Sequence, residues 1–330
     1  MVAKSDVLRC GADVLEDFIM ELSPLLLNSL LIDHTTSTET QQVNIFWATN
    51  DYEKLGDAYR FASPILPELI TGKNGHVIMP RVLKARQTQI ERSREMAEVF
   101  TPSWICNYQN NLVDTAWFGR EGVFNSLNPD HTWQVNEDKI TFPKGKTWQD
   151  YVRDKRLEIT CGEAPYMASR YDTTTGQEIP ISQRIGLLDR KLRIVSENTD
   201  RTDEWLSWAQ EAYKSVYGYE WQGDNLLIAR ENLLMTFWDC FRDKFGTNPQ
   251  LPSLQSIAYI VSWNFWQMDG LKGVVPNSCE DETISDLFGE TETDRCPGCA
   301  NEDLRAHNGS YCQIRTWRAE QKIRFIDIIN

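Results

Sequence analysis

Long apolar runs are missing from this 330-residue sequence, and no window approaches the roughly 18 to 20 apolar residues that a membrane-spanning helix needs. The first ten residues, MVAKSDVLRC, lack the apolar centre of a secretory signal peptide. Internal repeats and low-complexity tracts are also absent. We therefore expect a cytoplasmic globular protein without a membrane partner. Its 41% apolar content is enough for a large buried core.

Positive charge is scarce. The chain has 34 lysines and arginines against 48 aspartates and glutamates, which gives a net charge of −14. The electrostatic field of a chain with this negative net charge repels phosphate backbones unless basic residues cluster locally or a partner supplies them. The most basic segment, PRVLKARQTQIERSREMAEVF, has helical spacing, and we interpret its cations as a solvated helix face rather than a phosphate site. The composition therefore argues against direct DNA binding.

Cysteine is also sparse, and eight cysteines without a signal peptide fit a reducing compartment better than a disulfide scaffold. Four of them, Cys279, Cys296, Cys299 and Cys312, lie in one polar, turn-rich stretch. The Cys-Pro-Gly-Cys turn presents two thiolates, and the two distant thiols can complete a tetrahedral zinc site, although His307 could replace one ligand. Buried thiols without a metal are the alternative. We predict a structural zinc in an insertion over residues 277–314.

Apolar spacing divides the chain into two parts. Residues 12–31 have helical spacing, with Pro24 breaking or kinking the run, and we assign residues 1–90 to a helical N-terminal region. From residue 150 onward, short apolar runs alternate with helices, as is typical of a parallel sheet with crossover helices. We therefore predict an α/β fold, with residues 91–330 as the second domain.

Capping residues and apolar runs predict the later elements. RLEITCG and YGYE read as strands, and TDEWLSWAQEAYKSVYG reads as a helix with Gly218 as its C-cap. The next predicted helix runs from an Asp224 N-cap to a Gly246 C-cap. SIAYIVSWNFWQMD is predicted as a strand that ends in Asp269.

Glu220 follows a predicted strand and precedes a long helix. In a Rossmann-like unit, an acid at this place points into the crevice and accepts hydrogen bonds from a ribose. Gly162, with the small Ala164 nearby, could supply the turn that lets the backbone approach such a ligand. Taken singly, each feature is more often a surface residue, a cap or a chance match, so their order along the chain carries the interpretation.

Four segments resemble, in the same order, the N6-adenine DNA methyltransferases of restriction-modification systems. EVFTPSW is similar to the motif that closes over S-adenosylmethionine in this family, and LEITCGEAPYMA resembles its glycine-rich loop. VYGYEWQGDNLLIARENLL and SWNFWQMDGL resemble the segments that supply a ribose-binding acid and an aspartate for the adenine amine of the cofactor. The resemblance covers roughly residues 92–270 and implies a Rossmann-like methyltransferase sheet. The residues that it places at the cofactor are Phe100, Thr101, Pro102, Glu158, Gly162, Ala164, Glu220 and Asp269.

The sequence departs from this family in two ways. Gly162 and Glu220 are separated by 57 residues, where about 20 is typical of dinucleotide folds, so residues 169–198 are expected to form an excursion with a hairpin and a helix. The family's N/D-P-P-Y/F loop, which holds the flipped target adenine, occurs nowhere in the sequence. RFIDIIN resembles the strand that leads into this loop, and an unrelated strand paired in the sheet is the alternative. We therefore assign no catalytic residue.

These observations predict the S-adenosylmethionine-binding part of a site-specific adenine-N6 DNA methyltransferase that is inactive as this chain alone. DNA would be reached only through a C-terminal continuation or a partner chain that supplies the missing loop and a basic surface. One alternative is a non-catalytic acidic interaction protein, a pseudo-methyltransferase or DNA-mimic regulator that binds a restriction-modification or DNA-handling partner. A small-molecule methyltransferase is disfavoured by the opening motif.

Overall fold

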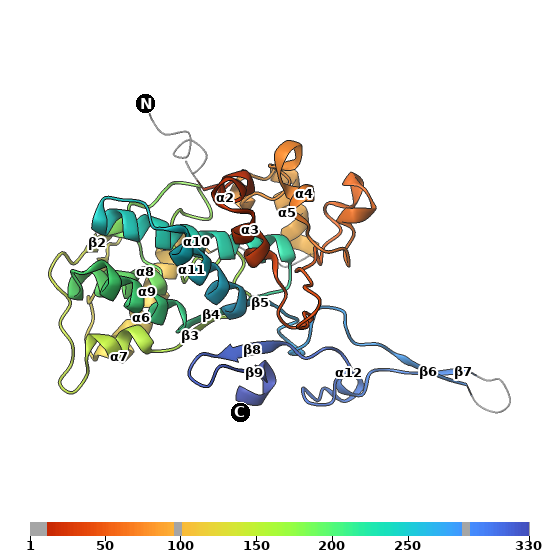
Figure 1. Cartoon of the computed structure of the whole chain (residues 1–330). Coiled ribbons are helices and arrows are strands. Elements are labelled where there is room, and N and C mark those ends of the chain that lie inside the picture. Colours follow the sequence, from red (N-terminus) through yellow and green to blue (C-terminus); the bar gives the residue numbers. More distant parts are fainter. Residues whose placement is uncertain (1–11, 96–100, 286–290, 330) are drawn as a thin grey trace.

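The computed structural model describes residues 12–95, 101–285 and 291–329 of the chain. These residues form a mixed α/β structure around a parallel three-stranded sheet, with three pairs of antiparallel strands outside it (Figure 1). Within these ranges, every helix is too short or too polar to span a lipid bilayer. The predicted combination of helices with a parallel sheet is confirmed.

The parallel sheet has the order β3-β4-β5. Its central strand, β4 (Val216–Glu220), lies between β3 (Arg156–Glu158) and β5 (Phe265–Gln267). The register places Glu158 beside Gly218 and Glu220 beside Gln267. Because all three strands run in one direction, their carboxyl ends meet at one edge of the sheet.

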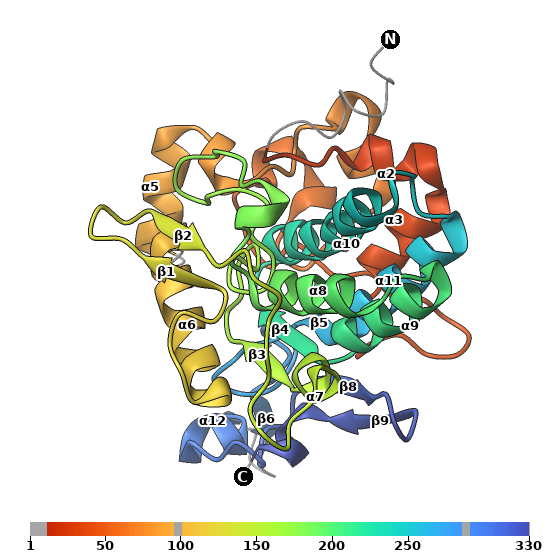
Figure 2. The same cartoon turned by 90° about the vertical axis from the view of Figure 1, so that its left-hand side faces the viewer.

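Two pairs of helices make the crossovers between these strands (Figure 2). The first pair connects β3 to β4 and the second connects β4 to β5, so the predicted alternation of strands and helices is confirmed. The four helices are α8 (Leu187–Asn198), α9 (Thr202–Tyr213), α10 (Gly223–Phe245) and α11 (Leu251–Asn264).

Two predicted helix boundaries are wrong. The helix α9 ends at Tyr213, and Gly218 lies inside β4, where a Cβ atom would be 2.5 Å from the Phe265 ring. A glycine is therefore needed here for close strand packing, not for a helix end. The Gly246 C-cap of α10 is confirmed by its left-handed φ of 68°, but Gln222 rather than Asp224 is the N-cap residue.

The predicted strand over residues 256–269 is mostly helical. The helix α11 occupies it up to Asn264, and only residues 265–267 form β5. A mostly apolar run of this length does not distinguish a buried helix from a strand by its period, so the pattern was ambiguous. The buried residues that fit the helical spacing are Leu254, Ile257, Ala258 and Val261.

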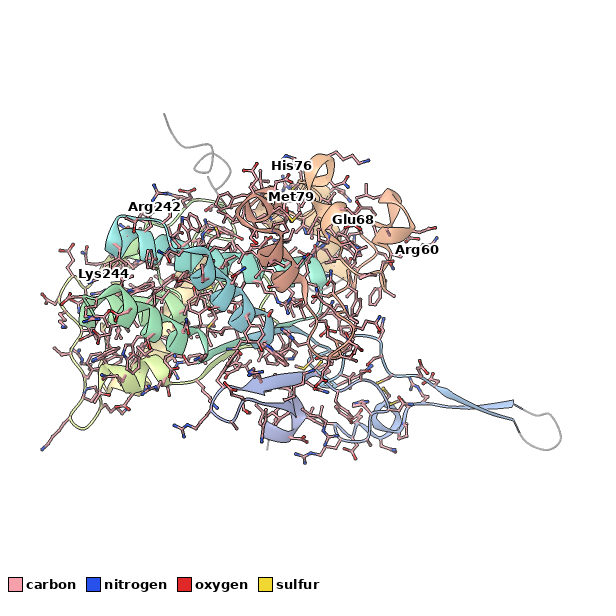
Figure 3. All side chains as sticks on the ribbon, in the orientation of Figure 1. Arg60, Glu68, His76, Met79, Arg242 and Lys244 are labelled. Atoms are coloured by element: carbon pink, nitrogen blue, oxygen red, sulfur yellow. The ribbon has the colours of Figure 1, made fainter. Side chains whose placement is uncertain are left out.

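The N-terminal helices α2 (Glu16–Leu22) and α3 (Pro24–Leu31) confirm the predicted helix pair broken at Pro24. Arg60, Glu68 and His76 are exposed side chains of the N-terminal region (Figure 3). The same view labels Arg242 and Lys244, which lie near the C-terminal end of α10. Two further helices complete the N-terminal region, namely α4 (Pro67–Ile70) and α5 (Arg86–Glu95), with 3-10 turns at Glu53–Leu55, Asp57–Tyr59, Gly72–Asn74 and Arg81–Leu83.

The N-terminal helices share their core with the sheet. Arg230 of α10 is fully buried and donates hydrogen bonds to the carbonyl oxygens of Leu30 and Ile32, at 2.5 and 3.0 Å. It also donates to the carbonyl oxygen of Phe265 in β5. A single cluster of buried apolar side chains accordingly extends from Val14 to Phe265.

The basic segment before residue 100 is only in part the solvated face that we predicted, since Arg86 is exposed but two other cations are not. Lys84 and Arg92 are buried, and both lie 3.0 Å from Asp224 Oδ2 at the start of α10. Tyr52 donates a further hydrogen bond to the same carboxylate, at 2.7 Å. The sequence could not show this pairing because the partner is more than a hundred residues away. Arg94, by contrast, is exposed.

The segment before α8 contains the expected excursion. An isolated antiparallel bridge joins Tyr171 to Glu178, and α8 follows, which matches the predicted hairpin and helix. A 3-10 turn at Ile181–Gln183 connects them. The elements before it are α6 (Ser103–Phe118), β1 (Asn125–Leu127), β2 (Trp133–Val135) and α7 (Trp148–Arg153).

The C-terminal segment forms a hairpin that packs on the sheet. Its strands, β8 (Gln313–Thr316) and β9 (Gln321–Arg324), pair with each other and not with β5. Residues Phe325–Ile328 form a 3-10 turn, so the prediction that RFIDIIN is a strand of the main sheet is wrong. The Phe325 ring lies 5.0 Å from Trp266, and this burial against the sheet explains the apolar character of the segment.

The insertion between the sheet and this hairpin holds the remaining elements. They are β6 (Glu282–Ser285), β7 (Thr291–Asp294) and α12 (Pro297–Asn301). The strands β6 and β7 pair in antiparallel fashion and extend away from the body of the molecule (Figure 1).

Candidate functional site

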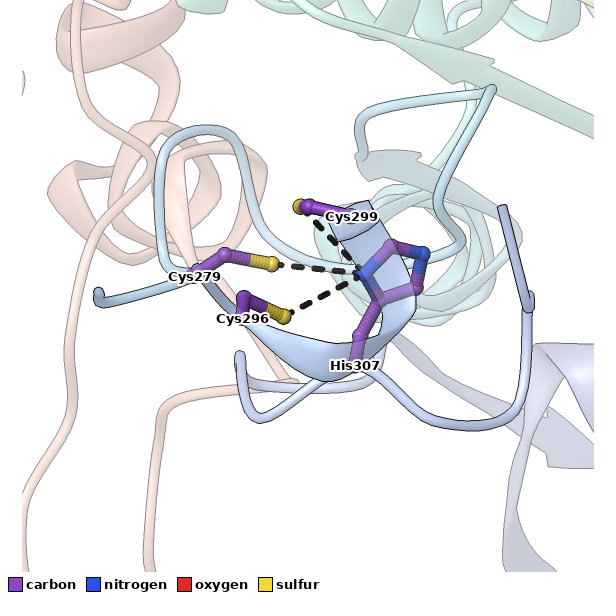
Figure 4. Close-up of side chains that lie close together, drawn as sticks. All are labelled: Cys279, Cys296, Cys299 and His307. Atoms are coloured by element: carbon purple, nitrogen blue, oxygen red, sulfur yellow. Dashed lines mark hydrogen bonds between the residues drawn. The ribbon is translucent and has the colours of Figure 1, made fainter. Parts of the chain in front are cut away.

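Three cysteines and one histidine of the insertion converge on one point (Figure 4). The Sγ atoms of Cys279, Cys296 and Cys299 each lie 3.6 Å from His307 Nδ1. Zinc bonds of about 2.3 Å to sulfur and 2.0 Å to nitrogen, at the tetrahedral angle, would also separate these atoms by about 3.6 Å. The cluster could therefore hold a metal ion such as zinc.

A tight turn brings these ligands together. Cys296 is the N-cap residue of α12, and Cys299 lies in its first turn. The turn packs directly on His307, because a Cβ atom at Gly298 would lie 2.5 Å from His307 Nδ1. The Gly298 amide also donates a hydrogen bond to the Ala306 carbonyl oxygen, at 2.9 Å. Glycine is therefore needed at the centre of the Cys-Pro-Gly-Cys turn.

The surroundings of Cys296 favour the thiolate form. Its Sγ atom accepts a hydrogen bond from the Asn308 amide at 3.4 Å. Burial opposes ionisation, but this bond, the Cys299 amide and the His307 ring outweigh it and lower the pKa of Cys296 to about 6. Thiolates are the form in which cysteine binds metals.

Cys312, our predicted fourth ligand, lies outside the cluster. It is fully buried, and its thiol donates a hydrogen bond to the Gln267 carbonyl oxygen at 3.3 Å. Cys312 packs in the apolar cluster between the sheet and the C-terminal hairpin, together with Trp266 and Phe325. His307 takes its place among the candidate ligands, as the sequence had left open.

A second candidate site is a cavity of about 1120 Å³ at the carboxyl ends of β3 and β4. Phe100 lies outside the described residues. The predicted cofactor residues that line the cavity are Thr101, Glu158, Gly162 and Glu220. Those that do not line it are Pro102, Ala164 and Asp269.

Glu220 joins the two strand ends. Its Oε2 atom accepts a hydrogen bond from the Gly162 amide at 2.8 Å, so the acid after β4 holds the loop after β3. Its Oε1 atom accepts from the amides of Trp221 and Gln222, at 2.9 and 3.2 Å. Burial raises the pKa of Glu220 in spite of these bonds. The Glu220 carboxylate therefore lines the cavity and holds the loop after β3 in place.

Glu158 is the second carboxyl group of the cavity, and only 7% of it is exposed. Its Oε1 atom accepts a hydrogen bond from the Tyr166 amide at 3.3 Å, whereas Oε2 has no hydrogen-bond partner among the described residues. Burial raises the pKa of Glu158 to about 8. The cavity wall thus contains a buried carboxyl group that is protonated at neutral pH and has an oxygen atom free for a further hydrogen bond.

We expect Glu158→Gln to flatten the pH dependence of stability between about pH 4.5 and 8. The pKa of Glu158 is about 8 in the folded protein and 4.5 when unperturbed, so the folded state keeps the proton over this window. The free energy of unfolding of the native protein should therefore fall as pH rises through the window, by about 1.4 kcal/mol for each pKa unit. Urea unfolding of both proteins from pH 4 to 9 measures the difference. Parallel curves would contradict the raised pKa.

The loop after β3 has an unusual backbone. Thr160, Gly162 and Ala164 all have left-handed φ values, of 45°, 52° and 59°. Ala164 stands where the resemblance has a second glycine, and it keeps the conformation that glycine favours. A left-handed residue other than glycine costs about 1 to 2 kcal/mol. Such local strain is concentrated at functional sites.

Asp269 belongs to a turn after β5. Its carboxylate accepts a hydrogen bond from the Leu271 amide at 3.0 Å and lies 3.6 Å from Lys272 Nζ. Its amide donates to the Val274 carbonyl oxygen, at 2.8 Å. These contacts lie within the turn, and Asp269 does not line the cavity.

Several lining residues were not predicted from the sequence. Phe61 comes from the N-terminal region, which the resemblance does not cover, and Arg94 is an exposed cation of α5. Gln222 and Asn225 follow Glu220 directly, at the start of α10. Their closeness to a strand end was the one available signal, because side chains in the first turn of such a helix lie beside the same edge of the sheet.

No family model matches the chain, and no curated protein or solved structure matches it. The function has to be inferred from the geometry of the metal cluster and the cavity.

Proposed function

We propose that the cavity binds S-adenosylmethionine in a Rossmann-like domain, and that the chain is the cofactor-binding part of an adenine-N6 DNA methyltransferase. The hydrogen bond between the Gly162 amide and Glu220 supports this proposal most strongly. It holds a glycine-containing loop against an acid of the neighbouring parallel strand, inside one cavity. Open α/β sheets bind nucleosides at this edge.

The polar groups of the cavity fit such a ligand. The Oε2 atom of Glu158 has no partner among the described residues, and because the raised pKa keeps this carboxyl group protonated at neutral pH, Oε2 can donate a hydrogen bond to a ligand oxygen. Glu220 Oε2 accepts one hydrogen bond, from the Gly162 amide, and can accept a further bond from a ribose hydroxyl. Arg94 is an exposed cation in the lining and suits a ligand carboxylate. When bound, S-adenosylmethionine supplies an activated methyl group, and the residues named here bind and orient it.

We place the catalytic acceptors for the target adenine outside these 330 residues. The sequence contains no N/D-P-P-Y/F tetrapeptide, and that loop holds the flipped base in the enzymes that the chain resembles. For the metal cluster we propose a structural role. Three cysteines and one histidine fill a tetrahedral zinc site completely, which leaves no open position for chemistry.

We expect the chain to bind S-adenosylmethionine, and Glu220→Ala to weaken binding by more than about tenfold. A ribose hydroxyl would lose its acceptor, and one such hydrogen bond to a charged group contributes about 1.5 to 3 kcal/mol. Isothermal titration calorimetry measures both affinities, at a temperature where circular dichroism shows that the variant is folded.

Glu204→Ala is the matched control, because Glu204 is an exposed acid on α9 outside the cavity. It should bind like the native protein. The cofactor assignment is refuted if the native chain shows no binding, or if Glu220→Ala binds with native affinity. DNA methylation by the chain alone would contradict the placement of the catalytic loop elsewhere.

A further inference from the structure

A second cavity, of about 770 Å³, lies between the parallel sheet and the C-terminal hairpin. Four parts of the chain line it: residues 153–157 before and within β3, residues 211–217 around the start of β4, Trp266 of β5, and residues 314–328 of the hairpin. Leu157 lines both this cavity and the carboxylate cavity, so the two are neighbours along β3. The methyltransferase proposal makes no use of this second cavity.

The lining of this cavity is strongly cationic, although the whole chain carries a net charge of −14. Glu211 is its one carboxylate, and it is already bonded to Arg153 at 3.0 Å and Lys214 at 3.4 Å. Six cations and one carboxylate therefore line the cavity, while Asp154 and Glu320, which lie outside the lining, form ion pairs with Arg156 and Arg315. The six cations are Arg153, Lys155, Arg156, Lys214, Arg315 and Arg318.

Four of these cations have unused hydrogen-bonding or ion-pairing capacity. The Nε atoms of Arg156 and Arg315 are buried, and neither has a hydrogen-bond partner in the described part of the chain. Lys155 and Arg318 are exposed, and neither forms an ion pair with any described residue. A buried donor without a partner costs free energy, which a ligand that accepts the bond would recover. An anion with several oxygens can accept hydrogen bonds from such cations.

Aromatic rings stand beside these cations. Trp317 is half-buried, and its ring centre lies 5.4 Å from the Arg315 guanidinium and 5.9 Å from Lys214 Nζ. A hydrogen bond of 2.9 Å from Trp317 Nε1 to Asn264 fixes the ring. The half-buried Tyr217 adds a hydroxyl group that has no hydrogen-bond partner in the described structure. A ligand of this cavity can thus combine an anion with a flat, apolar ring.

We propose that this cavity binds single-stranded nucleic acid, with phosphate oxygens on Arg156 and Arg315 and a base against Trp317. Such direct binding departs from our expectation, based on the net charge of the whole chain, that DNA is reached only through a continuation or a partner chain. A groove of cations beside an aromatic ring is the arrangement by which proteins bind single strands. The cavity has the volume of a small-ligand pocket, for which about 300 to 1,000 Å³ is typical, and such a space excludes a duplex. In a single strand, the bases are exposed and can reach the ring.

The test is fluorescence anisotropy of the full chain with a labelled mixed-sequence oligodeoxynucleotide of about ten residues, at several salt concentrations. With two or three phosphates neutralised, log K should fall against log salt with a slope of about −1.4 to −2.1. The double variant Lys155→Glu/Arg318→Glu should bind roughly tenfold more weakly or worse at low salt. Both side chains are exposed, so its melting temperature should stay native.

The double variant Lys139→Glu/Lys144→Glu is the matched control, because it changes the net charge equally at two exposed lysines outside the cavity. It should bind like the native chain. The proposal is overturned if the oligonucleotide does not bind, if both double variants weaken binding equally, or if a duplex of the same length binds as tightly. S-adenosylmethionine binding is measured separately, so the two proposals can fail independently.

Discussion

Protein purified without chelators is expected to contain about one zinc per chain, and His307→Ala is expected to remove it. Zinc binding contributes about 10 to 16 kcal/mol in small zinc domains, so its loss should disorder residues 277–285 and 291–311. The parallel sheet should stay folded, because the cluster lies outside its core. Elemental analysis measures the metal, and hydrogen exchange with mass spectrometry locates the loosened segment.

Cys312→Ala is the matched control for this experiment. Cys312 bonds to the Gln267 carbonyl oxygen, far enough from the cluster to leave its four ligands intact. The variant should therefore keep its zinc while losing some stability of the hairpin. Retention of zinc by His307→Ala together with loss by Cys312→Ala would restore the ligand set that the cysteine spacing first suggested.

Asp224→Ala is expected to lower the free energy of unfolding by about 3 to 5 kcal/mol, which is typical when one partner of a buried ion pair is removed. The change leaves Lys84 and Arg92 buried without their shared carboxylate. Burial opposes the ionised carboxylate, but Arg92 and Lys84 outweigh it and hold the pKa of Asp224 well below its usual range. Chemical denaturation at pH 7 measures the loss.

The pH dependence supplies a second readout for the same variant. Since the folded pKa of Asp224 is depressed, its contribution is fully present above the unfolded pKa of about 4 and is lost as the pH falls further. The difference between native protein and variant should therefore shrink in acid. Asp243→Ala, at an exposed position of the same helix, should change stability by no more than about 0.5 kcal/mol. Equal losses in the two variants would show that the buried pair contributes nothing.

The sequence predicted the elements whose signals are local. Pro24 divides two helices and Gly246 ends α10, because each residue acts on the backbone beside it. The meeting of Gly162 with Glu220 could also be anticipated, since the carboxyl ends of adjacent parallel strands share one edge. Cofactor binding itself stays a prediction.

Features that depend on distant partners could not be predicted. From the sequence alone, Arg92 is expected on the surface, because its ion-pair partner Asp224 is distant along the chain. The spacing of four cysteines does not reveal that the hairpin buries Cys312, which leaves His307 to complete the cluster. The cationic cavity takes residues from segments around 155, 214 and 317, so no window of the sequence contains it.

The bonds of Arg230 bear on how the chain folds. They join carbonyl oxygens 198 and 200 residues away to the middle of α10. Contacts of such sequence separation close large loops and form late, because the loop-closure entropy has to be overcome before the contact stabilises anything. The N-terminal helices therefore gain the stabilisation that comes from these bonds only when the last crossover helix and β5 are in place. Synthesis from the N-terminus leaves them without their core until nearly the whole sheet has emerged from the ribosome.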